Sequence, residues 1–346
     1  MRPQPVIAVD ANGADLGPAE VAAGATLAAQ QGVRVLLFGP AAEMGNAGPG
    51  IEVIDAPLSI AKAANPAAAA RAHPESSIVR AARAVACGDA DALVSAGATG
   101  AAIAAGLFNV KRDRGILRPA LAARLPVPGA PVTLLDVGAN TEVRPEHLVQ
   151  FAFMGAALAV VVHGVSNPRV ALLSVGEEST RGTQLVLDVH ARLLGMKELN
   201  FVGNVEGHAL TEGRADVVVT DGFTGNVALK VMEGVSSKMI AELRATATSS
   251  RRAKAGGALM RPALRAFRDE ISPETAGGGY LLGLRKTGVV GHGRFTSRGF
   301  EHAILLAARG VTGDVVGRTH AALDRAGALR KLGPAMSESG STVSLS

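Results

Sequence analysis

VIAVDANGADLGPAEVAAGATLAAQQGVRVLLF, residues 6–38, contains the pattern from which the fold class is inferred. It begins with an apolar, β-branched run at 6–10, continues with an alanine-rich helical pattern at 19–31, and ends with a second apolar run at 33–38. Short apolar runs bounded by turn residues predict strands, and the longer segment between them predicts a helix. Strand, helix and strand in this order are typical of an α/β fold.

The same alternation continues along the chain. Further strands are predicted at 51–54, 92–95, 132–137, 170–175, 200–202 and 217–220, and further helices at 77–86, 145–161, 183–194 and 226–243. Several of these strands are continuously apolar, as strands covered on both faces should be. The sequence therefore predicts a three-layer α/β/α fold with a largely parallel sheet.

Composition narrows the class of protein. The chain has 346 residues, of which 48% are hydrophobic and 19% charged, so we expect one globular domain over 1–333 and a disordered Ser/Gly-rich tail at 334–346. The chain has no Trp and one Tyr, so few aromatic side chains are available to stack on nucleic-acid bases, and no nucleic-acid partner is expected. The single cysteine, Cys87, excludes an internal disulfide and is expected to be a small packed residue in a reducing compartment.

Targeting and metal signals are absent from the sequence. No signal peptide pattern precedes the first strand, and the apolar run at 151–162 is shorter than the roughly 20 residues of a membrane span. The eight histidines are scattered singly, and no HExxH pattern occurs, so no metal is expected. The dinucleotide fingerprint GxGxxG, the P-loop and the GxSxG nucleophile elbow are also missing.

The positive charge is concentrated in one segment. The formal net charge is +5, yet residues 238–268 contain eight Lys and Arg residues against Glu242 alone. Apolar residues at 260, 264, 267 and 271 lie among them at helical spacing, so 244–275 is predicted to be a basic amphipathic helical excursion from the core. A basic segment of this kind favours an acidic partner or an anionic lipid surface.

Five predicted strands end in small or polar residues with glycine. The candidates that we single out after these strands are Asp10, Gly97, Thr99, Asn140, Arg181, Asp221, Gly222, Thr224, Gly225 and Asn226. Ligands of open α/β sheets lie beyond the carboxyl ends of the strands, and exposed backbone N–H groups at a helix start bind anions such as phosphate. The alternative is that Gly, Asn and Asp at these positions only form turns and helix caps.

The sequence resembles a known protein family in several ordered blocks. Ordered blocks resemble the phosphate:acyl-acyl-carrier-protein acyltransferases, the PlsX family: 106–108 with 118–122, 134–140 with 144–151, 201–207, 221–230, and finally His292-Gly293. The resemblance extends from about residue 5 to about residue 325. It departs from the family pattern at Asn12 and Ala14 in the first turn, at Ala98, and at Arg181, where the family usually has lysine.

The resemblance implies an activity. Members of the family transfer a fatty acyl group from acyl carrier protein to inorganic phosphate, and the acyl phosphate formed serves glycerophospholipid synthesis. It implies a fold like that of the isocitrate and isopropylmalate dehydrogenases and of phosphotransacetylase, a homodimer, no cofactor, and a cytoplasmic enzyme at the membrane surface.

Roles follow for the candidate residues. Arg181 and Asn226 are the expected catalytic residues, since they could hold phosphate and the charge that develops on the thioester oxygen. Asn140, Thr99 and His292 are expected to line the same cavity. Asn226 as a helix cap, Arg181 as a surface ion-pair residue and His292 as a structural residue remain alternatives.

The basic excursion then has two possible uses. The residues expected to dock on a membrane or on the acidic carrier protein are Arg251, Arg252, Leu259, Met260, Arg261, Leu264, Arg265 and Phe267. The alternative is that its apolar residues form a dimer or domain contact while the arginines remain solvated. For the whole chain, two other functions stay open: a phosphotransacetylase-like enzyme using coenzyme A thioesters, and a non-catalytic scaffold that binds membrane and carrier protein.

Overall fold

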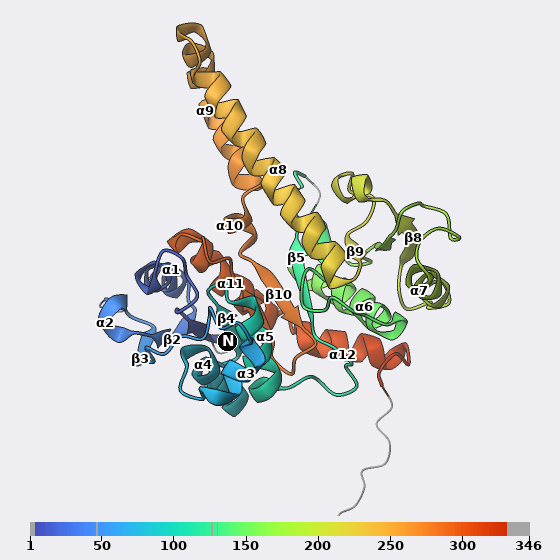
Figure 1. Cartoon of the computed structure of the whole chain (residues 1–346), viewed down its shortest axis with the longest axis horizontal. Coiled ribbons are helices and arrows are strands. Elements are labelled where there is room, and N and C mark those ends of the chain that lie inside the picture. The colour runs from blue at the N-terminus through green and yellow to red at the C-terminus, as the bar shows by residue number, and fades with distance from the viewer. Residues whose placement is uncertain (1–3, 46–47, 126, 130, 331–346) are drawn as a thin grey trace, which may run out of the picture.

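A computed structural model describes residues 4–45, 48–125, 127–129 and 131–330 (Figure 1). The tail expected at 334–346 lies outside these residues. The strands form one sheet in the order β3-β2-β1-β4-β11-β10-β5-β6-β9-β7-β8. Their bounds are β1 Val6–Asp10, β2 Arg34–Gly39, β3 Ile51–Asp55, β4 Ala92–Ser95, β5 Ala120–Arg124, β6 Thr133–Leu135, β7 Val170–Leu173, β8 Phe201–Val205, β9 Val217–Val219, β10 Gly279–Leu282 and β11 Thr287–Val290.

The sheet reverses direction in its middle. Strands β3, β2, β1, β4 and β11 are mutually parallel, and so are β6, β9, β7 and β8. Between these halves, β10 pairs antiparallel with both β11 and β5, and β5 pairs antiparallel with β6. The sheet is therefore largely parallel, but its two halves point in opposite directions, so their carboxyl ends do not share one edge.

Helices cover both faces of the sheet. On one face lie α1 Pro18–Gln30, α6 Pro145–Val162, α7 Gln184–Leu194, α11 Ser297–Thr312 and α12 Val315–Arg325. On the other lie α3 Pro66–Ala72, α4 Ser77–Cys87 and α5 Thr99–Ala105, which continues as the π-helical turn Gly106–Val110, together with the first turns of α8 Gly222–Thr248. The α/β/α layering is confirmed.

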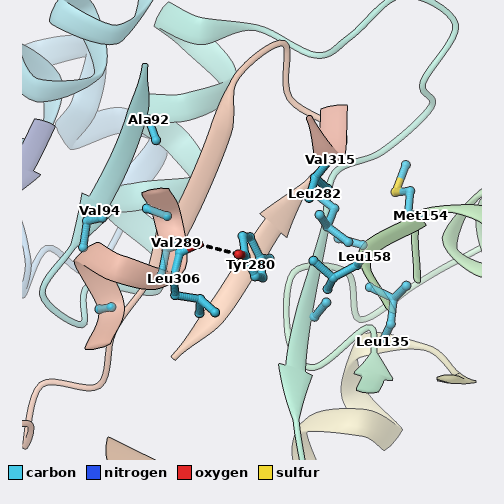
Figure 2. Close-up of a cluster of buried hydrophobic side chains, with 14 of the residues drawn as sticks. Ala92, Val94, Leu135, Met154, Leu158, Tyr280, Leu282, Val289, Leu306 and Val315 are labelled. Carbon is cyan, nitrogen blue, oxygen red and sulfur yellow. Dashed lines mark hydrogen bonds between the residues drawn. The ribbon is translucent and has the colours of Figure 1, made fainter. Parts of the chain in front are cut away.

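Side chains alternate between these two layers along each strand, as the pleat requires. Tyr280 and Leu282 of β10 belong to the apolar cluster beneath α6 and α11, whereas Leu281 between them belongs to the cluster beneath α4 and α5. Figure 2 shows part of the first cluster, in which the buried Tyr280 hydroxyl donates to the carbonyl oxygen of Leu306. Each face of the sheet thus has its own packed core.

A helical hairpin projects from this body (Figure 1). Helix α8 has 27 residues, about 40 Å, and turns back at Ser249–Ser250 into α9 Arg251–Glu270. The two helices approach closely near Gly257, where an added Cβ would lie 3.1 Å from the Cβ of Ala247. Helix α9 has no buried residue, so the predicted basic excursion is helical and leaves the core, but it begins within the longer α8.

The remaining elements are short. They are α2 Ala41–Met44, a 3-10 turn Gly207–Thr211 and α10 Pro273–Ala276. One helix, Pro145–Val162, is long and apolar enough to cross a membrane by length and composition, but 67% of it is buried inside the protein, as expected of a core helix. Cys87 is exposed at the end of α4, so the expectation that it packs into the core was wrong.

Candidate active site

An apolar cavity of about 340 Å³ lies against the middle of the sheet. Its floor includes Leu121 and Ala123 of β5 and Val290 of β11, which belong to the same core cluster as α4 and α5. Other lining residues are Thr99, Arg124, Leu125, Val137, Gly138, Thr141, Gly222, Phe223, Asn226, Leu229, Lys230, Glu233, Glu270, Ser272, Pro273, Ala276, Gly278, Gly279, Gly291, His292 and Phe295. The cavity thus lies where the two parallel halves meet, the place where α/β sheets bind ligands.

A polar groove of about 920 Å³ adjoins this cavity. The two hollows share the lining residues Thr99, Lys230, Gly291 and His292. We call these four residues the junction. The groove continues along the first turn after β1 and along residues 58–63, and its lining includes Lys62, His73 and Arg294. The arrangement provides an apolar chamber and a basic, polar chamber that meet at one point.

The loop after β6 forms one wall of the cavity, and Asp136 holds this loop. Its buried carboxylate accepts hydrogen bonds from the backbone N–H groups of Leu121, Gly138, Ala139 and Asn140 and from the Asn140 side chain. Burial raises the pKa of Asp136, and these hydrogen bonds oppose the rise. The Asn140 amide also donates to the Pro119 carbonyl at 2.7 Å, so its side chain is buried in the wall and is not among the cavity-lining groups.

The first turn of α8 packs directly on this loop. A Cβ at Gly225 would lie 1.9 Å from the Asp136 carbonyl oxygen, and one at Gly222 would lie 2.6 Å from that of Asn140. Asp221 caps the helix, since its carboxylate accepts from both the N–H and the hydroxyl of Thr224. Glycine is therefore required at 222 and 225 by close approach, while Asp221 and Thr224 fix the helix start.

These contacts occupy amides that the sequence suggested for an anion. The N–H of Gly222 donates to Asn140, that of Thr224 to the Asp221 side chain, and that of Gly225 to the Asp221 carbonyl. By contrast, α5 begins after Ala98, which provides no side-chain cap. The N–H of Thr99 donates to the Gly97 carbonyl oxygen. Because the first N–H groups of a helix have no partner within the helix, the donors that α5 offers to an anion are the N–H groups of Gly100 and Ala101.

One face of α8 supplies polar groups to the cavity. Asn226, Leu229, Lys230 and Glu233 all line it, at the i, i+3, i+4 and i+7 spacing that places residues on one side of a helix. The Asn226 side chain lies next to Gly138, where an added Cβ would be 3.6 Å from the Asn226 Oδ1. Asn226 is therefore not a helix cap but an internal helix residue facing the cavity.

Lys230 connects this helix to the junction. Its Nζ lies 2.8 Å from a Glu233 carboxylate oxygen and 3.4 Å from Nε2 of His292. Burial and then the charge of Lys230 hold the pKa of His292 below its ordinary value, while Glu233 opposes them. The junction thus combines a cation with an imidazole whose pKa is lowered and whose Nε2 faces that cation.

The first turn, after β1, is organised around Asp10. The Ser77 hydroxyl donates to the Asp10 carboxylate at 2.6 Å, and Asn12 donates from its side chain to Ser77 at 2.9 Å. Burial raises the pKa of Asp10 to about 6. Asn12, one of the departures from the family pattern, therefore has a defined place in this network and lines the groove.

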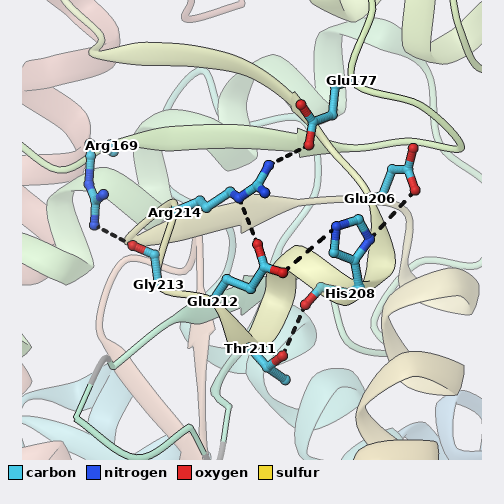
Figure 3. A network of polar contacts seen from close by, with 8 residues as sticks. All are labelled: Arg169, Glu177, Glu206, His208, Thr211, Glu212, Gly213 and Arg214. Atoms are coloured by element: carbon cyan, nitrogen blue, oxygen red, sulfur yellow. Dashed lines mark hydrogen bonds and ion pairs between the residues drawn. The ribbon is translucent and has the colours of Figure 1, made fainter.

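Arg181 lies in the loop after β7, and that loop is tied to another part of the protein. The Arg181 side chain is 67% exposed and lies 3.8 Å from Glu178. In the same loop Glu177 pairs with Arg214, which also pairs with Glu212 in a network that includes His208 and Glu206 (Figure 3). Arg181 is not among the described residues that line the cavity or the groove.

The structure therefore brings together some of the predicted site residues and not others. Those that line the hollows are Gly97, Thr99, Gly222, Asn226 and His292. Asp10, Asn140, Asp221, Thr224 and Gly225 lie beneath or beside them and hold the turns. Arg251, Arg252, Leu259, Met260, Arg261, Leu264, Arg265 and Phe267 lie on α9, apart from both hollows.

The site residues predicted from the sequence do not include Lys230, Glu233 or Arg294, which line the cavity or the groove. Lys230 and Glu233 follow Asn226 by four and seven residues, so a helical wheel drawn from Asn226 would have placed them on its face. Among the described residues, no group of three or more His, Cys, Asp or Glu side chains could hold a metal ion.

The chain matches a known protein family over most of its length. The family described as "Fatty acid synthesis protein" matches residues 6–318. The chain belongs to this fatty acid synthesis protein family. The match confirms the resemblance to the PlsX family that the ordered sequence blocks indicate.

Curated relatives of the family are similar over most of their length. The phosphate acyltransferase of Pelotomaculum thermopropionicum is 42% identical over 312 residues, which cover 88% of this chain and 91% of that protein. The phosphate acyltransferase of Thermobifida fusca is 43% identical and covers 90% of this chain and 89% of its own length. That of Geobacillus thermodenitrificans is 42% identical, with coverage of 92% and 99%.

Solved structures show the same fold at low identity. A phosphotransacetylase from Streptococcus pyogenes superposes with a TM-score of 0.60 at 16% identity and covers 89% of this chain and 94% of its own. A branched-chain phosphotransacylase from Enterococcus faecalis V583 gives a TM-score of 0.56 at 16% identity, with coverage of 88% and 99%. The fold of this chain is therefore phosphotransacetylase-like.

Proposed function

We propose that the protein transfers a fatty acyl group from acyl carrier protein to inorganic phosphate, forming acyl phosphate and free carrier protein. The observation that carries this proposal is the junction, where an apolar cavity meets a basic groove at Thr99, Lys230 and His292. The reaction needs these two environments side by side, since one substrate carries a hydrocarbon chain and the other is a dianion. The membership of the phosphate acyltransferase relatives in the same family supports it.

Each substrate has a matching environment. The apolar wall formed by Leu121, Ala123 and Leu229 suits the acyl chain, because burial of hydrocarbon is favourable by roughly 25 cal/mol per Å². The thioester carbonyl then lies at the junction, with the Asn226 amide as a donor to its oxygen. Phosphate lies beside it, held by Lys230 and by the N–H groups at the start of α5.

The chemistry at the junction is a direct displacement. An oxygen of HPO₄²⁻ attacks the thioester carbon, the C–O bond forms, and the carbonyl oxygen gains the negative charge that Asn226 and Lys230 stabilise. The C–S bond then breaks and returns the electron pair to sulfur. The phosphate proton passes to His292 Nε2 and from there to the leaving thiolate, so the products are acyl phosphate and the free thiol. Phosphate is already a nucleophile at neutral pH, so positioning is the main requirement.

No cofactor takes part in this scheme, because no bond in it is oxidised or reduced. Arg181 does not take part in it directly, and any contribution that this residue makes is indirect, through the loop after β7. We also propose that the fold is related to that of the isocitrate and isopropylmalate dehydrogenases. A turnover comparison of Arg181→Ala with wild type measures how much that loop contributes.

The second candidate is a phosphotransacetylase-like reaction on coenzyme A thioesters, which the similarity of fold favours. The experiment is a comparison of kcat/KM for long-chain acyl carrier protein and for the same acyl group on coenzyme A, both with phosphate. We expect the carrier-protein substrate to be preferred at least tenfold. A preference for the coenzyme A substrate would favour the second candidate, and no turnover of either would support the scaffold hypothesis.

The helical hairpin extends the proposal to the membrane surface, where a cytoplasmic enzyme of this kind would deliver its lipid product. Leu259 on α9 is 85% exposed and Met260 is 57% exposed, next to Arg261 and Arg265. Each Lys or Arg near an anionic leaflet contributes about 1 kcal/mol. Charge reversal of Arg251, Arg252, Arg261 and Arg265 to Glu is expected to abolish co-sedimentation with anionic vesicles. Unchanged binding would remove the electrostatic part of this proposal.

Homodimer formation is the last part of the proposal. An exposed apolar stripe follows α8 at every fourth residue: Phe223, Val227, Val231, Val235, Met239 and Leu243. A helix that presents such a stripe without covering it commonly pairs with another helix. Val235→Glu is expected to shift the sedimentation mass from dimer to monomer, and a monomeric wild-type protein would contradict the pairing.

A further inference from the structure

We propose that the acyl carrier protein docks over the mouth of the polar groove, on a patch formed by Lys62, His73 and Arg294, and not at the tip of the helical hairpin. We call this patch the groove mouth. The inference rests on the proposed acyl transfer and adds to it the surface that recognises the carrier. Its partner is an acidic protein with a long prosthetic arm that ends in the thioester.

The three groove-mouth residues come from separate parts of the chain. Lys62 lies in the turn before α3, His73 directly after α3, and Arg294 between β11 and α11. All three are exposed, yet all line the same groove. Within the described residues, none of the three forms a hydrogen bond or ion pair with an acidic side chain, although Asp15 lies in the groove lining. The charges of Lys62 and Arg294 are thus available to an acidic partner.

The groove connects this surface to the reacting atoms. Its lining includes Thr99, Lys230 and His292, which it shares with the cavity, and the three exposed groove-mouth residues. The arm of a carrier protein is rich in amide and hydroxyl groups and carries a phosphodiester at its attachment point. A polar groove whose exposed lining residues include Lys62 and Arg294 fits these polar and anionic groups, while the apolar cavity that adjoins it at the junction fits the acyl chain.

The prosthetic arm is too short for the carrier protein to dock at the tip of the hairpin. From Lys230 to the end of α8 at Thr248 there are 18 residues, about 27 Å of helix, and Arg251 and Arg252 follow at the turn. The prosthetic arm has about as many bonds as four or five extended residues, so it spans roughly 16 Å. A carrier protein held only at the tip could not place its thioester at the junction.

The side chains of α9 and of the groove mouth also suit different partners. Helix α9 combines its arginines with exposed Leu259, Met260 and Phe267, and that mixture suits a lipid surface. The groove mouth carries charge, and no large exposed aromatic side chain is among the described residues that line the groove. Leu58 is an exposed apolar residue in that lining. A charged rim around a narrow opening suits an acidic protein, because electrostatic complementarity raises the association rate and orients the partner.

The test uses the full-length protein and measures binding separately from turnover. The variant is Lys62→Glu with Arg294→Glu. The control is Arg285→Glu with Lys286→Glu, the same change of charge at exposed residues before β11, at the opposite end of that strand from His292. The Kd of a fluorescently labelled long-chain acyl carrier protein is measured by anisotropy for wild type, variant, control and the four-residue α9 charge reversal.

We expect the groove-mouth variant to raise this Kd at least tenfold, and the control and the α9 variant to change it less than threefold. The KM for acyl carrier protein should rise tenfold relative to the KM for the same acyl group on N-acetylcysteamine, which lacks the carrier. Salt should weaken binding of wild type more than binding of the variant. An unchanged Kd in the groove-mouth variant, or a tenfold loss in the α9 variant alone, would overturn the proposal.

The outcome is distinguishable from a failure of the proposed function. If neither thioester is turned over by wild-type protein, the acyl transfer is wrong, yet the Kd values still decide whether the carrier binds at the groove mouth. If both thioesters are turned over and the Kd values do not change, the acyl transfer stands and the docking surface lies elsewhere.

Discussion

Nζ of Lys230 lies 3.4 Å from Nε2 of His292, although 62 residues separate the two in sequence. The contact joins α8, from one half of the sheet, to the loop after β11, from the other half. Glu233 holds the same ammonium group at 2.8 Å. The junction between cavity and groove is therefore built by the meeting of two halves that run in opposite directions.

The first prediction concerns the pH dependence of this pair. The neutral imidazole of His292 is the form that accepts a proton, and the Lys230 charge helps to hold its pKa below the ordinary value. In Lys230→Met that contribution is lost, so the pKa rises and the acidic limb of the kcat/KM profile should move to higher pH. In Glu233→Gln the opposing charge is lost, and the limb should move to lower pH. Shifts of the same sign in both variants would contradict the assignment.

The second prediction concerns Asn226. Its amide faces the cavity from α8, so Asn226→Ala should remove one donor to the developing oxyanion. Loss of one such donor typically raises the barrier by about 3 kcal/mol, so kcat should fall by a factor on the order of 100 with KM little changed. Circular dichroism and thermal unfolding serve as the folding control. Near-normal turnover in a folded variant would exclude Asn226 as a catalytic residue.

The third prediction compares two glycines of the same helix. A Cβ at Gly225 would lie 1.9 Å from the Asp136 carbonyl oxygen, whereas Gly234 has nothing within 4 Å. Gly225→Ala should therefore displace α8 and lower the free energy of unfolding by about 3 kcal/mol or more. Gly234→Ala should raise it by about 0.5–1 kcal/mol, because alanine favours the helix. Urea unfolding of both variants checks this, and equal effects would show that α8 does not rest on the loop.

The fourth prediction concerns the stability contributed by Asp10. Its pKa in the folded protein is raised from 3.8 to about 6, so between about pH 4 and pH 6 the folded state binds more protons than the unfolded chain. Stability from this group is present at low pH and is lost as the pH rises through that window. Asp10→Asn lacks the buried charge and should be more stable than wild type by about 3 kcal/mol at pH 8.

The control for Asp10 is the same comparison at pH 4. There the wild-type carboxyl is protonated in the folded protein, so the two unfolding free energies should nearly coincide. A difference of equal size at pH 4 and pH 8 would show that a change in hydrogen bonding, not charge, explains the effect.

Much of the fold could be predicted because its strands are apolar and its helices amphipathic. The strands at 6–10 and 92–95 are found as predicted, and the helix predicted at 145–161 differs by one residue from α6. Strands β5, β10 and β11 were missed. They are four or five residues long, and β10 and β11 contain glycine at 279 and 288, which weakens a strand pattern.

Missing these three strands had a consequence for the site. They make up the antiparallel middle of the sheet, so without them all carboxyl ends were expected at one edge. That expectation grouped Arg181 with Thr99 and Asn226. In that half of the sheet, β7 lies beyond β6 and β9 from the middle, so the loops after β6 and β9 reach the cavity and the loop after β7 does not. Lys230 lies in the place that was expected for Arg181.

Acyl transfer to phosphate can be followed in a single incubation of purified protein with long-chain acyl carrier protein and ¹⁸O-labelled phosphate. We predict that carrier release rises with phosphate and saturates, and that each free thiol is matched by one acyl phosphate whose bridging oxygen carries the label. The Lys230→Met protein should release far less carrier. Release that does not depend on phosphate, or free fatty acid in place of acyl phosphate, would contradict transfer to an oxyanion bound at the junction.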